Sequence, residues 1–259
     1  MRRLRRLKRV SWAEPSLNSE VDFAVSQGGI AITFFVPCYN EEENVEKALE
    51  AIQRVMASRG LTYEVLVMDD GSADKTSEAV RRYQAAHPDA PIRLHRNPTN
   101  LGLGTCYLEG ASLAKGEYYM IVNGDGDLSA DSLSAIVDRM GQADIISPYL
   151  ANQKDRPLLR RVLSAIFKKL VDFLGGCPLR YYNGPVLHRR SNIVGAGIRA
   201  RGFGYQAELL CDLIRRGCSV IEVPYTSVYP HQQTDAFRLK NILSVGESLV
   251  RIFWTRMNQ

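Results

Sequence analysis

The sequence lacks several features that would assign the chain to a common class at once. It has no uncharged apolar run of about 18 residues or more, so no membrane-spanning helix is predicted. Its five cysteines are scattered without the spacing of metal ligands, and an odd, dispersed set fits reduced thiols in a cytoplasmic protein. No apolar core follows the first arginines, which argues against a secretory signal peptide. With 259 residues and 45% hydrophobic content, the chain is long enough for one large α/β domain.

Positive charge is concentrated in two parts of the chain. The formal net charge is +5, and without the six cations of residues 2–9 the rest of the chain is near −1. A second group of arginines and lysines lies between residues 154 and 201, where few acids accompany them. Such patches can attract nucleic acid, an anionic membrane surface or phosphorylated substrates. We interpret residues 1–27 as a flexible basic leader.

From residue 28 onward, apolar β-branched runs alternate with amphipathic segments. Asn40 is expected to cap the first helix, because its side chain can accept a hydrogen bond from a free backbone N–H. Strands are predicted at residues 30–36, 63–68, 92–95, 118–123 and 144–147, with helices at 41–58, 74–86, 131–140 and a segment ending at 114. This alternation predicts a mainly parallel sheet with ligands at the carboxyl ends of its strands.

The second half of the chain is less regular. Helices are predicted at residues 158–174, 206–215 and 236–255, and a strand at 219–223 is expected to stop at Pro224. The helix at 158–174 carries apolar residues on one side and arginines and lysines on the other. It fits either an ordinary helix packed on the sheet or a basic helix that faces a membrane or acts as a lid.

Acidic residues follow three of the predicted strands. Asp125 and Asp127 come directly after the strand at 118–123, and the glycines beside them allow the backbone to turn so that both carboxylates face one ligand. Alone, such a pair is most simply a polar turn. However, residues 41–43 and 69–70 bring further acids to the ends of two other strands. Their convergence indicates a site for hydroxyl groups, base donors and a divalent cation, Mg²⁺ or Mn²⁺.

Five motifs occur together in a characteristic order. They are Val36-Pro37-Cys38-Tyr39-Asn40-Glu41, Val67-Met68-Asp69-Asp70-Gly71-Ser72, Asn100-Leu101-Gly102-Leu103-Gly104-Thr105, Asp125-Gly126-Asp127-Leu128 and Ile221-Glu222-Val223-Pro224. With them the chain resembles, over about residues 31–228, a family-2 glycosyltransferase of the GT-A nucleotide-sugar fold, in the branch of dolichyl- or polyprenyl-phosphate mannose synthases. The resemblance implies a catalytic domain at 28–235, with a nucleotide half at about 28–148 and an acceptor half at about 149–235. A C-terminal amphipathic helix at 236–259 would follow.

The resemblance also implies roles in donor binding. It places Pro37, Tyr39 and Glu41 at the base and ribose of the nucleotide and Asp70 at the base, which Met68 would contact through its backbone. Asp125, Gly126 and Asp127 resemble the DxD motif, which holds the ribose and a Mg²⁺ or Mn²⁺ ion that bridges the diphosphate. Such an ion would neutralise the charge that develops on the leaving group.

On the acceptor side, Arg156, Arg160 and Ser164 resemble the spacing with which this branch grips an acceptor phosphate. Arginine forks suit phosphate, although a solvated basic face would have the same composition. Glu208 resembles an acid that lies beneath the acceptor, where it would act as a general base. An acid on a helix near several arginines is equally often part of a structural ion pair.

Two segments depart from the branch pattern. Residues 180–185 and 229–235 replace segments that normally contact the diphosphate and the sugar, which leaves open both the sugar and the nucleotide. In the second segment, His231 is a candidate third metal ligand or diphosphate contact, or a surface histidine without a role. Arg238 and Lys240 are candidates to restore the lost positive charge.

The combined prediction is an inverting, metal-dependent glycosyltransferase. It would use a nucleoside-diphosphate sugar and a lipid-linked or other phosphate-bearing acceptor, as a peripheral protein at the cytoplasmic membrane face. A hydroxyl acceptor in glycolipid or polysaccharide synthesis is the alternative. A nucleotidyltransferase would need a glycine-rich phosphate loop after the first strand, which residues 37–41 do not form, and a non-catalytic relative would not need the acid pair. No nucleic-acid partner is predicted, because aromatic residues do not interleave with the basic leader. The oligomeric state is left open.

Overall fold

A computed structural model describes residues 29–196, 198, 202, 204–228 and 239–257. Its centre is a seven-stranded sheet in the order β3-β2-β1-β4-β6-β5-β7. The strands are β1 (Ile32–Cys38), β2 (Tyr63–Asp69), β3 (Ile92–Arg96), β4 (Tyr118–Ile121), β5 (Ile145–Leu150), β6 (Leu187–Arg189) and β7 (Val220–Tyr225). β3, β2, β1 and β4 are mutually parallel, β6 is antiparallel to both of its neighbours, and β5 is parallel to β7. The predicted mainly parallel sheet is therefore confirmed.

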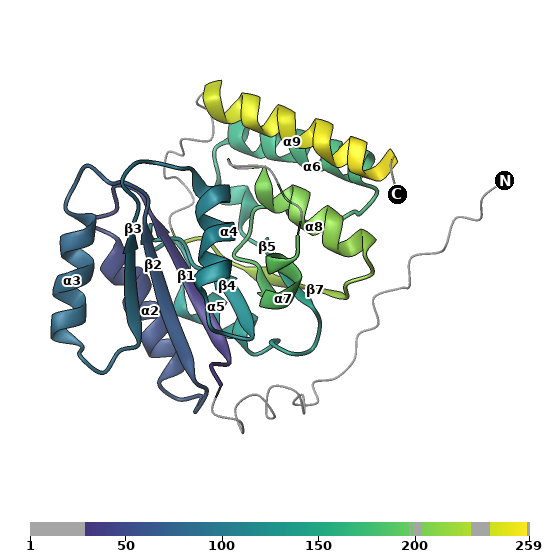
Figure 1. The fold of residues 1–259 in the computed structure, drawn as a ribbon. Coiled ribbons are helices and arrows are strands. Elements are labelled where there is room, and N and C mark those ends of the chain that lie inside the picture. The colour runs from purple at the N-terminus through teal and green to yellow at the C-terminus, as the bar shows by residue number, and fades with distance from the viewer. Residues whose placement is uncertain (1–28, 197, 199–201, 203, 229–238, 258–259) are drawn as a thin grey trace.

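Helices cover both faces of this sheet (Figure 1). They are α2 (Val45–Met56), α3 (Thr76–Ala86), α4 (Leu103–Leu113), α5 (Ala130–Val137), α6 (Leu158–Gly175), α7 (Arg190–Val194), α8 (Tyr205–Arg215) and α9 (Leu239–Met257), with a short 3₁₀ turn at Gln153–Asp155. Because both faces are covered, successive strand residues are buried on opposite sides. Phe34 belongs to the core beneath α2, α3 and α5, and Phe35 to the core beneath α4 and α8.

Three local predictions were wrong or incomplete. Asn40 does not cap a helix: α2 begins only at Val45, and the Asn40 side-chain oxygen accepts a hydrogen bond from Ala73 N at 2.9 Å. β7 does not stop at Pro224 but runs on to Tyr225, which is possible because β7 lies at the edge of the sheet, where a missing N–H is tolerated. β6 was not predicted, because three residues are too few to show a periodic pattern.

Some predicted features lie outside the described residues, namely the leader at 1–27, His231 and Arg238. Among the described helices, none combines the length and the apolar composition that crossing a bilayer requires.

The contact of α4 with the sheet depends on a glycine. A Cβ atom added to Gly110 would lie 2.5 Å from Tyr119 Oη and 2.6 Å from Phe35 Cε2. We expect Gly110→Ala to lower the free energy of unfolding by about 1–3 kcal/mol, because overpacking outweighs the better helix propensity of alanine. Urea denaturation measures this change. Gly246→Ala is the matched control in α9, where an added Cβ meets nothing within 4 Å. An equal effect of both substitutions would contradict this account of the α4 contact.

Candidate functional site

Carboxylates from three strand ends gather around one buried thiol. Cys38 ends β1, and burial raises the pKa of its thiol well above the ordinary value. The negative charges of Glu41, Asp69 and Asp125 raise the pKa of this thiol further. Glu41 follows β1, Asp69 is the last residue of β2 and Asp125 follows β4, and these strands are parallel neighbours in the sheet. The structure therefore brings together the acids that the sequence placed at strand ends.

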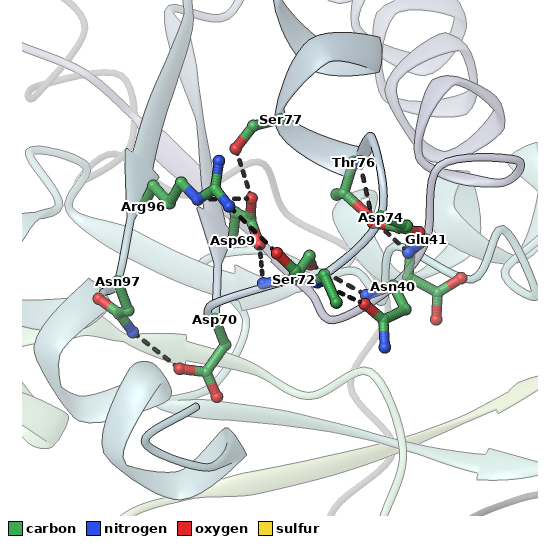
Figure 2. Close-up of polar contacts among 11 residues, drawn as sticks. Asn40, Glu41, Asp69, Asp70, Ser72, Asp74, Thr76, Ser77, Arg96 and Asn97 are labelled. Atoms are coloured by element: carbon green, nitrogen blue, oxygen red, sulfur yellow. Dashed lines mark hydrogen bonds and ion pairs between the residues drawn. The ribbon is translucent and has the colours of Figure 1, made fainter. Parts of the chain in front are cut away.

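The loop after β1 is fastened to the loop after β2 (Figure 2). Asn40 N donates to Ser72 Oγ at 2.9 Å, and Glu41 N donates to Thr76 Oγ1 at 2.8 Å. These bonds fix the backbone that carries Glu41, and burial raises the pKa of its carboxyl group. Tyr39 is exposed beside it. Tyr39 and Glu41, two of the predicted nucleotide-lining residues, thus lie on a loop whose backbone is fixed at the carboxyl ends of β1 and β2.

Asp69 and Asp70 are adjacent but serve different loops. Asp69 is fully buried and accepts hydrogen bonds from Ser72 N at 2.9 Å and from the Ser77 hydroxyl. Arg96 approaches the same carboxylate, with 3.7 Å between its Nε and Oδ2 (Figure 2). Asp69 therefore holds together the turn that leads from β2 to α3.

Asp70 instead organises the segment that leads into α4. Its carboxylate accepts hydrogen bonds from Asn97 Nδ2, Leu101 N and Gly102 N, each at 2.9 Å, and also interacts with the Cys106 thiol. An ionised carboxylate offers about four acceptor positions, so this chain's own donors occupy most of them. The contact of Asp70 with a base stays a prediction, and so does that of Met68, which is buried within β2.

Close packing against β1 positions the acid pair. After β4 ends, Gly124 N donates to Pro37 O at 3.2 Å, and a Cβ atom on Gly124 would lie 2.5 Å from Cys38 Sγ. Gly126 has φ +68°, a left-handed conformation that turns the chain between the two acids. Asp127 N then donates to Asp125 Oδ1 at 3.0 Å. The turn that the glycines predicted is therefore present.

Asp127 is oriented by a residue that sequence reasoning missed. The Ser227 hydroxyl lies 2.7 Å from each of the two carboxylate oxygens of Asp127. Ser227 is buried, and Asn152 hydrogen-bonds both its N–H and its carbonyl. No pattern in the sequence pointed to this serine, because it is 100 positions from Asp127 and belongs to no motif.

Two arginines of the α6 region lie within electrostatic range of the acids. Burial lowers the pKa of Arg160, and Arg156 lowers it further, whereas Asp127 acts in the opposite direction. Arg156 donates to Tyr181 Oη at 3.2 Å, and its Nε is buried without a hydrogen-bond partner among the described residues. Arg160 in turn opposes the rise that burial causes in the pKa of Asp125. Predicted donor-side acids and acceptor-side arginines therefore interact electrostatically.

Beside these residues, α6 borders a cavity of about 240 Å³. Ser164 and Lys168 face it from α6, and Arg180 and Asn183 face it from the following loop. Glu208 is buried in the first turn of α8, and its role as a base stays a prediction.

The two carboxylates of the acid pair supply part of the ligands that a hard divalent cation needs. Asp125 and Asp127 supply carboxylate oxygens, the ligand type that Mg²⁺ and Mn²⁺ prefer. No group of three or more His, Cys, Asp or Glu side chains within the described ranges could hold a metal ion. Two carboxylates suffice when water molecules and substrate phosphates complete the coordination, so the pair fits a metal that binds together with a diphosphate.

The chain is also similar to known proteins. The family model for Glycosyl transferase family 2 matches residues 33–191. Dolichyl-phosphate beta-glucosyltransferase ALG5A of Trichomonas vaginalis is 28% identical over 176 residues, which cover 62% of this chain and 54% of that protein. The chain therefore spans about half the length of this relative. Polyprenol monophosphomannose synthase of Mycolicibacterium smegmatis is 29% identical over 206 residues, covering 74% of this chain and 75% of that protein.

Solved structures share the fold. The crystal structure of glucosyl-3-phosphoglycerate synthase from Mycobacterium tuberculosis, in complex with Mn²⁺, UDP-glucose and phosphoglyceric acid, has a TM-score of 0.64 at 20% identity. The match covers 93% of this chain and 86% of that one. This likeness confirms the predicted GT-A fold.

The hydrogen bond from Ser227 should matter for a metal at the acid pair. We expect Ser227→Ala to weaken Mn²⁺ binding in the presence of a nucleoside diphosphate by about tenfold or more, because residues that orient a metal ligand typically contribute that much. Electron paramagnetic resonance of free Mn²⁺ measures the affinity without any activity assay. Ser112→Ala is the control, since Ser112 is exposed on α4 and its hydroxyl donates to Leu108 O of the same helix. Unchanged affinity in Ser227→Ala would remove Ser227 from the site.

Proposed function

The chain belongs to glycosyl transferase family 2, as its motifs predicted, and from this membership we propose that it is an inverting, metal-dependent glycosyltransferase. It would move a sugar from a nucleoside-diphosphate donor to a lipid-linked, phosphate-bearing acceptor. The observation that carries the proposal is that Arg160 interacts electrostatically with both Asp125 and Asp127, and Arg156 with Asp127. Such an arrangement can hold a diphosphate on its metal side and an acceptor phosphate on its arginine side.

The nucleotide would lie along the carboxyl ends of β1 and β2, where Pro37, Tyr39 and Glu41 would contact the base and ribose. Asp125 and Asp127 would hold Mg²⁺ or Mn²⁺, with Ser227 fixing the orientation of Asp127. When bound, the metal would neutralise the negative charge on the diphosphate leaving group. Mn²⁺ and UDP-glucose in the structurally similar synthase support this kind of donor, although the sugar and the base are not assigned.

The acceptor would approach from the side of α6. Arg156, Arg160 and Ser164 would bind its phosphate, whose oxygen would attack the anomeric carbon from the face opposite the leaving group. The relatives named as dolichyl-phosphate and polyprenol enzymes support an acceptor of this class. A phosphate is already ionised near neutral pH and needs no general base, whereas a hydroxyl acceptor would need one, and Glu208 would then be required. The effect of Glu208→Gln on transfer therefore separates the two acceptor classes.

The location that fits such an acceptor is the cytoplasmic face of a membrane, with peripheral attachment. A nucleotidyltransferase is less well supported, because the loop after β1 is held by side chains of Ser72 and Thr76 and is not a glycine-rich phosphate loop.

The donor and metal assignments can be tested together. We expect one of the UDP-, GDP- or CDP-sugars, with Mn²⁺, to raise the melting temperature and to support transfer to a short-chain polyprenyl phosphate. Asp127→Ala should reduce transfer by about a thousandfold while unfolding stays cooperative, because a charge-stabilising group is lost. Asp89→Ala, at an exposed turn, should leave transfer unchanged. The assignment fails if no donor shifts the melting temperature, or if Asp127→Ala keeps its activity.

Adjacent arginines offer a matched test of the acceptor side. Arg160 is half-buried beside Arg156 and Asp127, whereas Arg161 is exposed on another side of the same helix. Arg160→Gln should raise KM for the polyprenyl phosphate by about tenfold, as expected for loss of a charge-assisted hydrogen bond worth roughly 1.5 kcal/mol. KM for the donor should change much less. Equal effects of Arg160→Gln and Arg161→Gln would point to a general electrostatic role and not to a phosphate contact.

A further inference from the structure

The side-chain amide of Asn152 extends the pairing of two strands beyond their ends. The parallel ladder of β5 and β7 reaches Leu150 and Tyr225, and Ala151 N then donates to Tyr225 O at 2.8 Å. Beyond that point, Asn152 Nδ2 donates to Ser227 O at 3.0 Å, and Asn152 Oδ1 accepts from Ser227 N at 3.1 Å. Ser227 therefore receives both of its backbone hydrogen bonds from one side chain, as it would from a neighbouring strand.

Because a side chain replaces the backbone in this pairing, the main chain at Asn152 is free to turn away. Its φ of −93° and ψ of 38° are no longer extended, and its carbonyl accepts from Asp155 N at 3.1 Å in the 3₁₀ turn. Arg156 follows this turn, and α6 with Arg160 begins two residues later. Asn152 thus stands at the point where the chain leaves the sheet for the acceptor side.

The segment that Asn152 holds leads to the donor side. Ser227 is 5% exposed, so its backbone groups depend on partners within the protein. Its hydroxyl contacts both carboxylate oxygens of Asp127 at 2.7 Å, and Val228 N donates to Asp127 O at 3.0 Å. An aspartate at position 152 could not donate to Ser227 O, and a glutamine would reach one methylene too far. The amide of asparagine therefore suits this position in both length and chemistry.

We infer that Asn152 is a positioning residue that couples the donor side of the site to the acceptor side. On the donor side it fixes Ser227, and through Ser227 the carboxylate of Asp127. On the acceptor side it anchors the start of the turn that carries the chain to Arg156 and Arg160. The inference rests on the proposed function and adds to it the contact that relates the metal carboxylate to the acceptor arginines.

On the donor side, Asn152→Ala should weaken Mn²⁺ binding in the presence of UDP or GDP about tenfold, because the hydroxyl of Ser227 loses its fixed position. Electron paramagnetic resonance of free Mn²⁺ measures this affinity without sugar transfer. Since Asn152 acts on the metal through Ser227, the double variant Asn152→Ala with Ser227→Ala should bind Mn²⁺ no more weakly than Ser227→Ala alone. Independent losses would multiply instead, and that result would overturn the inference.

On the acceptor side, Asn152→Ala should raise KM for a short-chain polyprenyl phosphate about threefold to tenfold at saturating donor, the range expected when one hydrogen bond that anchors the turn is lost. Ser227→Ala should leave this KM unchanged, because its backbone still holds Asn152. Equal KM in Asn152→Ala and the wild type would restrict Asn152 to the donor side and overturn the coupling.

The matched control is Gln142→Ala. Gln142 also uses its side-chain amide twice, donating to Asp138 O and accepting from Arg139, each at 3.3 Å, in the turn after α5. Its loss should change neither the Mn²⁺ affinity nor KM.

Asn152→Ala should still unfold cooperatively, because Thr226 N donates to Ser132 Oγ at 3.1 Å and continues to hold the segment after β7. Asn152→Gln is a second variant, which keeps the amide but displaces it by one methylene. It should weaken Mn²⁺ binding and raise KM in the same pattern as Asn152→Ala.

The outcomes separate this inference from the proposed function. If the wild type binds no Mn²⁺ with either nucleoside diphosphate, the proposed function fails, and this inference fails with it. If the wild type binds Mn²⁺ and the two Asn152 variants bind it equally well, only this inference is overturned. The same holds if Gln142→Ala has the effects of Asn152→Ala.

Discussion

The crowding of negative charge at one edge of the sheet is the constraint on which the rest of the structure depends. Carboxylates from the ends of three parallel strands lie around the buried thiol of Cys38. Burial and the repulsion of neighbouring carboxylates raise the pKa of two of them, Glu41 and Asp125. Positive charge from elsewhere must balance them. Arg156 and Arg160 provide part of it, and a cation with a diphosphate would provide more. The fold is thus arranged to bring a cationic helix from the second half of the chain against an acidic edge built by the first half.

Different hydrogen bonds hold the individual acids or the loops that carry them, and these bonds make the site rigid. Backbone bonds to Ser72 and Thr76 fix the loop that carries Glu41. Donors from the segment before α4 hold Asp70, and Ser227 holds Asp127. The last contact matters for the architecture, because it joins the strand-end motif of the first half to a segment that follows β7. Asp127 is therefore the point at which the two halves of the chain meet at the site.

Most of the sheet and the acidic edge could be predicted from the sequence, because buried strands appear as continuous apolar runs and parallel strands place their carboxyl ends together. What could not be predicted depends on distant or very short features. β6 has three residues and no period. Ser227 contacts Asp127 across 100 positions. Asn40 looked like a helix cap because its type suits one, yet the position of α3 lets Ala73 N bond to it instead. Pro224 looked like a strand end, but its place at the sheet edge depends on tertiary topology.

The two-sidedness of α6 has a thermodynamic consequence. Leu159 and Arg160 are consecutive residues of the 18-residue helix α6; Leu159 is exposed, whereas Arg160 is half-buried and interacts electrostatically with Asp127. Any rotation or shift of the helix that moves the side chain of Leu159 also moves the guanidinium group of Arg160. Suppose that contact at the outer side and acceptor binding at the inner side favour the same orientation of α6. Each binding event then strengthens the other by the same free energy, since such coupling is reciprocal. Enzyme that has bound its acceptor would then leave that outer contact more slowly than empty enzyme.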